Sequence, residues 1–68
     1  MRKELFRASR KYFEGNIEKH RMNVEVYLNN PVGIGEHSDI MEAIESELAI
    51  MAEYRDKLEI LDKYFFEE

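Results

Sequence analysis

The stretch YLNNPVGIGEHSDIM, residues 27–41, holds the only proline and two of the three glycines of this 68-residue chain. Proline cannot continue a helix, and it pushes the residue before it out of the helical backbone region. Glycine lets the backbone reverse without a steric cost. The stretch therefore predicts a single turn at about residues 30–37, made by Asn30, Pro31, Gly33 and Gly35.

Before the turn, apolar residues recur with steps of seven, four, three, four and three, which is close to the heptad period of packed helices. This stripe consists of Phe6, Phe13, Ile17, His20, Val24 and Tyr27. It predicts a helix over about residues 3–29. Gly15 costs about 1 kcal/mol in a helix interior, and Asn16 follows it, so we expect a bend or a weak point there.

After the turn, every position of a second stripe is apolar, with steps of three and four throughout. Its members are Met41, Ile44, Leu48, Met51, Tyr54, Leu58, Leu61 and Phe65. The stripe predicts a helix over about residues 38–66. A short connection makes two helices antiparallel neighbours, so the expected fold is all-α: one domain over residues 1–68, an antiparallel two-helix hairpin with helices about 40 Å long.

The chain is too small to hide much apolar surface, because a domain of this size buries only about 60% of what its unfolded chain exposes. It contains no cysteine, so neither a disulfide nor a thiolate metal site adds stability. A hairpin of two helices also has only one internal interface. We therefore expect a homo-oligomer, with a dimer that forms a coiled-coil-like four-helix bundle favoured, and we take the two apolar stripes as its core or oligomer interface.

Charge is divided between the two halves of the chain. Residues 1–30 carry seven Lys or Arg against four acids, a net of +3, and residues 36–68 carry three against eleven, a net of −8. The basic group of the first half consists of Arg2, Lys3, Arg7, Arg10 and Lys11. In an antiparallel hairpin this group lies beside the acidic end of the second helix, and we favour charge complementarity between them, within the hairpin or across a dimer. Contacts with nucleic acid phosphates are the less favoured alternative.

No catalytic, cofactor or metal constellation is recognisable in the sequence, so an enzyme is the least expected class and no cofactor is expected. His20 lies on an apolar stripe, and the usual meaning is a hydrogen-bonded core residue. The minority interpretation is a proton-sensitive joint. Gly33 and Gly35 precede a helix, but they lack the longer glycine pattern and the lysine of a nucleotide-binding loop.

No apolar run is long enough to cross a bilayer and no secretion leader is apparent, so a cytoplasmic location is expected. The segments NVEVYLNNPVGIGEHSDIMEAIESEL, residues 23–48, and AEYRDKLEIL, residues 52–61, resemble small uncharacterised proteins of large tailed phages, of the marine cyanophage type. The resemblance implies action in the cytoplasm of an infected bacterium, and it assigns no activity and no site residue.

The leading functional hypothesis from the sequence is a non-enzymatic, self-associating protein-interaction or assembly module, open to a further protein partner. Two alternatives are kept. One is a nucleic-acid accessory protein that uses the basic group. The other is an acidic inhibitor of a host protein, suggested by the run of acids that begins at Glu36 and ends at Glu47 without an intervening base.

Overall fold

A computed structural model describes residues 1–29 and 37–66 of the chain. It contains helix α1, Arg2–Asn29, and helix α2, His37–Phe65. The predicted all-helical hairpin is confirmed, since two helices of 28 and 29 residues pack against each other and the described residues contain no strand. Each helix bound lies within one residue of its predicted position. The predicted turn residues Asn30, Pro31, Gly33 and Gly35 lie outside the described residues.

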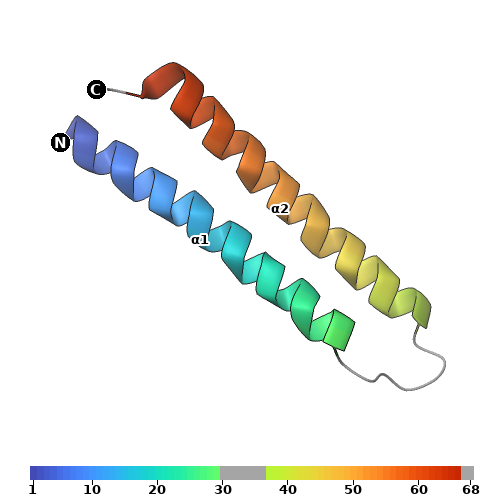
Figure 1. Ribbon diagram of the computed structural model, residues 1–68. Helices are drawn as coiled ribbons and strands as arrows, with labels where there is room; N and C mark the ends of the chain where they lie inside the picture. Colours follow the sequence, from blue (N-terminus) through green and yellow to red (C-terminus); the bar gives the residue numbers. More distant parts are fainter. Residues whose placement is uncertain (30–36, 67–68) are drawn as a thin grey trace.

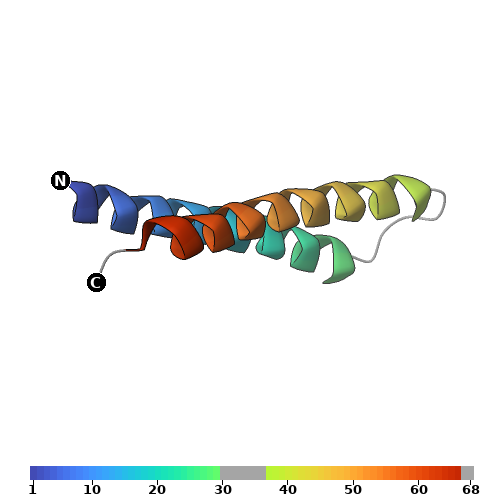
Figure 2. The same cartoon turned by 90° about the horizontal axis from the view of Figure 1, so that it is seen from above.

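The two helices run antiparallel, so the start of α1 and the end of α2 lie at the same end of the hairpin (Figure 1). Figure 2 shows that the helices cross rather than lie strictly parallel. Three contacts fix their register from the chain ends towards the turn: Arg2 meets the Phe65 carbonyl, the Phe13 ring meets Tyr54, and His20 meets Glu47. Helix α1 continues without a break through Gly15.

The contact between the helices consists of half-buried side chains, and no described residue is fully buried. On α1, all six members of the predicted stripe are half-buried against α2. Polar residues between them are half-buried as well, namely Ser9, Arg10, Asn16 and Asn23. The apolar periodicity therefore located the inward face of α1, while its polar members gave no periodic signal.

On α2 the stripe is only partly turned towards α1. Ile44, Met51, Tyr54, Leu58 and Leu61 are half-buried. By contrast, Met41 is 70% exposed, Leu48 50% and Phe65 51%. In the first half of α2 the half-buried positions that the stripe does not include are Ile40, Ala43, Glu47 and Ile50. The apolar surface of α2 is wider than its contact with α1. The most continuous apolar stripe therefore predicted an inward face that is rotated, around the helix axis, from the face that contacts α1.

The molecule is elongated, with extents of 52 × 15 × 13 Å and a radius of gyration of 15.8 Å. A compact domain of this length is expected to have a radius of gyration of about 11 Å. Two helices laid side by side are only two layers thick, and no third layer encloses their contact. The hairpin therefore leaves apolar side chains of both helices open to solvent.

Candidate interaction surface

A polar cluster crosses the middle of the helix contact. His20 Nδ1 lies 2.5 Å from Glu47 Oε1, and Asn23 Nδ2 donates to the same oxygen at 3.0 Å. The His20 and Glu47 side chains are only 14% and 17% exposed. Hydrogen bonds from His20, and secondly from Asn23, hold the pKa of Glu47 below its usual value. The cluster satisfies the polar groups that the helix contact encloses, and it gives His20 a hydrogen-bonding partner.

A forked ion pair closes the contact nearer the chain ends. Arg10 Nε donates to Asp62 Oδ1 at 2.7 Å, and Arg10 Nη2 donates to Asp62 Oδ2 at 2.8 Å. Arg10 Nη1 also reaches Glu14 on its own helix at 3.1 Å. The paired hydrogen bonds lower the pKa of Asp62 and raise that of Arg10. Both side chains are about one-third exposed, so solvent screens this pair more than the His20–Glu47 pair.

The structure divides the predicted basic group. Arg10 is committed to Asp62, and Arg2 Nη2 donates to the Phe65 carbonyl at 3.0 Å. Lys3, Arg7 and Lys11 are exposed and follow one another at four-residue spacing, so they form a ridge on one face of α1. The basic group therefore serves two roles, with one part joined to α2 and another part directed to solvent.

Aromatic rings pack near the middle of the hairpin. The Phe13 and Tyr54 ring centroids are 6.0 Å apart, and Tyr12 lies 5.9 Å from Phe13 and 6.4 Å from Tyr54. These distances are within the range of favourable aromatic pairs. Burial, and secondly the neighbouring Tyr12, raise the pKa of Tyr54. Tyr12 itself remains 62% exposed, so one ring of this cluster borders solvent.

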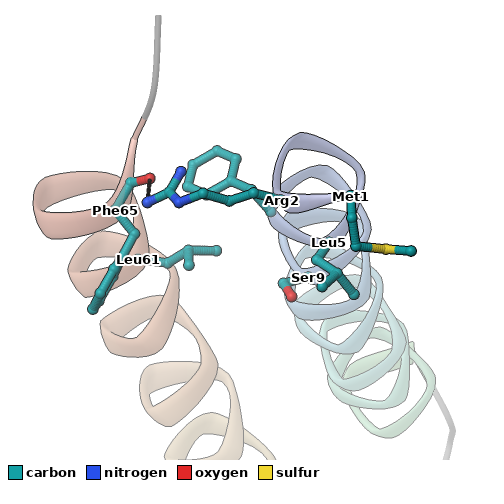
Figure 3. Close-up of a pocket in the computed structure, with 7 residues that line it drawn as sticks. Met1, Arg2, Leu5, Ser9, Leu61 and Phe65 are labelled. Carbon is teal, nitrogen blue, oxygen red and sulfur yellow. Dashed lines mark hydrogen bonds between the residues drawn. The ribbon is translucent and has the colours of Figure 1, made fainter.

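The chain ends frame an apolar hollow of about 530 Å³ between the two helices (Figure 3). Leu5 and Leu61 line it from opposite helices, and Arg2 reaches across its end to the Phe65 carbonyl, as the close-up shows. The remaining lining residues are Met1, Phe6, Ser9 and Phe65. A second hollow of about 260 Å³ lies closer to the turn and is lined by Ile17, Leu48, Met51, Ala52 and Arg55.

Exposed apolar side chains extend well beyond these hollows. Twelve of the large apolar residues that the structure describes are at least half exposed, among them Met22, Val26, Leu28, Ile60, Tyr64 and Phe66. Single exposed apolar residues are ordinary on protein surfaces, whereas continuous sets of them mark interaction sites. Exposed apolar residues lie on both helices of this hairpin, so its surface has the character of an interaction site.

Within residues 1–29 and 37–66, no three His, Asp or Glu side chains are grouped so that they could hold a metal ion. In the same ranges, neither helix has the length and apolar character that crossing a membrane requires. Comparison with protein-family models, with curated proteins and with solved structures gives no match to this chain. The resemblance to tailed-phage proteins therefore stays a prediction.

Proposed function

We propose that the chain is a non-enzymatic helical module that associates with a second copy of itself, forming a four-helix bundle that serves in protein assembly. One observation carries the proposal: the hairpin encloses no described residue, and twelve of its described large apolar side chains are at least half exposed. Chains this short need a further source of stability beyond a single helix contact. With no cysteine in the sequence, association is the source that this surface favours.

The phage resemblance supports a finer statement of the same proposal, in which the module acts in the cytoplasm of an infected bacterium. The mass of the protein in solution tests the core of the proposal. Multi-angle light scattering across the micromolar range is expected to give at least twice the 8.2 kDa chain mass. A well-folded, thermally stable particle with the mass of one chain throughout that range would refute self-association.

A second candidate function, binding to a polyanion such as nucleic acid, is favoured by the exposed ridge of Lys3, Arg7 and Lys11. Cationic side chains that contact phosphates displace counterions, so such binding weakens steeply with salt. Retention of the protein on heparin at low salt, and its loss when all three residues are changed to alanine, is the expected outcome for this candidate. Lack of retention of the unmodified chain would remove it.

A further inference from the structure

Helix α1 carries a second apolar strip, which the contact with α2 touches only at its edge, where Tyr12 meets Tyr54 and Leu5 borders the hollow beside Leu61. The second strip has alternating steps of three and four residues and lies one position away from the first, hence about 100° around the helix. We define it by its seven positions: Leu5, Ala8, Tyr12, Gly15, Lys19, Met22 and Val26. All seven are exposed in the hairpin, and the large apolar members are 50–62% exposed. The strip is continuous over nearly the whole helix, with Lys19 as its one charged member.

Gly15 occupies the centre of this strip. A glycine destabilises a helix interior relative to alanine, so its presence raises the question of what it accommodates. A Cβ built on Gly15 meets no atom within 4 Å. Nothing in the described hairpin therefore requires a glycine here. The space around that Cβ is open, about one helical turn from the exposed Tyr12, and it can accept a side chain from another molecule.

The area of the hairpin fits a partner of its own size. The chain exposes 5523 Å², whereas a compact protein of its mass is expected to expose about 4,500 Å². Two copies that each hid this excess would bury about 2,000 Å² together, which is the size of a specific and stable interface. A small ligand would leave most of the strip uncovered, so the area favours a second copy.

The charges on and beside the strip decide the direction of the partner helix. In a parallel pair of α1 helices, Lys19 would face the partner's Lys19, and Gly15 would leave a gap opposite the partner's Gly15. In an antiparallel pair, Tyr12 lies against the partner's Gly15, and the Lys19 stem covers the partner's Ala8. Leu5 then meets the partner's Met22. Because Leu5 lines the apolar hollow of Figure 3, this pair would cover one side of that hollow.

The flanking charges agree with the antiparallel direction. Lys11 and Glu18 are exposed and occupy equivalent positions beside the strip, seven residues apart. The antiparallel arrangement places Lys11 near the partner's Glu18, and the twofold axis repeats this pair. Glu4 and the partner's Glu25 also face each other, but they are exposed at the ends of the interface, where solvent and salt screen their repulsion.

We propose that two copies of this chain associate through antiparallel packing of their α1 helices along the second strip, with Tyr12 of each copy seated on Gly15 of the other. This inference rests on the proposed self-association and assigns its surface and direction. The partner class is a second copy of the same chain, and the site requires residues from both copies.

Disulfide trapping tests the direction, because the sequence contains no cysteine of its own. Leu5→Cys and Met22→Cys are prepared as single variants and oxidised, separately and as an equimolar mixture. A disulfide needs Cα atoms within about 7 Å. The mixture is expected to give the crossed Leu5→Cys/Met22→Cys dimer, and each variant alone little dimer. Arg21→Cys, which is exposed on the side of α1 away from the strip, mixed with Leu5→Cys is the matched control and is expected to remain monomeric on a denaturing gel.

A second variant tests the contact at Gly15. A Cβ at Gly15 meets no atom within 4 Å, and leucine favours a helix interior more than glycine does, so Gly15→Leu is expected to keep the helix folded by circular dichroism. The added side chain occupies the place of the partner's Tyr12, and the dimer dissociation constant is expected to rise at least about ten-fold. An unchanged dissociation constant overturns the proposed contact.

The outcomes separate this inference from the function on which it rests. Efficient self-linking of Leu5→Cys would show a parallel pair and overturn the proposed direction. If light scattering shows a dimer but the crossed disulfide does not form, self-association is supported and the proposed surface is wrong. The interface would then lie elsewhere, such as at the hollow lined by Ile17, Leu48 and Met51. A stable particle of one chain mass would reject both the surface and the proposed function.

Discussion

Replacing Phe13 by alanine is expected to remove most of the stability of this protein. Phe13 is half-buried in the helix contact and packs on Tyr12 and Tyr54. An enclosed aromatic side chain buries about 150–250 Å², so a half-buried one contributes about 100 Å². At about 25 cal/mol per Å² of apolar area, the truncation costs about 2.5 kcal/mol. Loss of the ring pairs adds about 0.5–1.5 kcal/mol.

The expected total is therefore about 3–4 kcal/mol, which is comparable with the whole stability of about 3–5 kcal/mol that a core of this size supplies. For a domain of this length, the melting temperature falls by about 4–8 °C per kcal/mol, so a decrease of about 12–30 °C is expected. The assay is urea and thermal unfolding followed by circular dichroism, at one fixed chain concentration because association shifts the equilibrium.

Leu28→Ala provides the matched control, since Leu28 lies on the same helix, is 66% exposed, and belongs to neither apolar strip of α1. Its truncation is expected to change the unfolding free energy by less than about 0.5 kcal/mol. Equal effects of Phe13→Ala and Leu28→Ala would refute the reasoning, because they would mean that the contact between α1 and α2 does not hold the protein together.

The remaining predictions concern the polar contacts. The pKa values of Glu47 and Asp62 are lowered in the folded protein. Each carboxylate therefore stabilises the fold at a pH above its pKa in the unfolded chain, and this stabilisation is lost as the pH falls through its pKa in the folded protein. Melting temperatures measured from neutral to acidic pH should fall on the acid side, and less so in Glu47→Gln and Asp62→Asn; an unchanged acid limb in both variants contradicts this assignment. Arg10→Ala is expected to lower the melting temperature more than Arg21→Ala, because Arg10 joins the two helices whereas Arg21 pairs with Glu18 of its own helix; the reverse order would show that the forked ion pair adds nothing. The double change His20→Leu and Glu47→Leu is expected to retain helix content but to give more than one set of amide resonances; a single sharp set would contradict a role of this pair in selecting the register.

The fold was accessible from the sequence because its two determinants are local. Proline at position 31 and the glycines that follow it predict an interruption between two helices, and apolar residues at steps of three and four define one face on each side. On α1 periodicity alone located the inward face, although a second apolar strip runs beside it. Gly15 and Lys19 weaken the apolar signal of that second strip, so apolar spacing suffices where one stripe is clearly the more apolar.

On α2 periodicity alone was not enough. Met41 and Leu48 continue the apolar stripe, yet the structure turns Ile40 and Glu47 inwards instead. An acidic residue gives no hydrophobic signal, and its inward position depends on His20 and Asn23 of the other helix. Pairing between helices is a tertiary property that no single-helix pattern contains. Likewise, the basic residues form one cluster in the sequence. Which of them pairs with α2 depends on the position of Asp62 opposite Arg10, and the sequence alone does not give that position.

The polar contacts explain why this hairpin has one register although heptad stripes permit several. Two apolar helices can slide past each other by seven residues and still bury apolar faces. Such a shift would move Glu47 from His20 to a place opposite Phe13 in one direction, or opposite Tyr27 in the other. Either move would leave a largely enclosed carboxylate without its hydrogen-bond donors, which is costly. Removing the pair would relieve that cost in every register at once, so His20 and Glu47 contribute more to the choice of structure than to its stability.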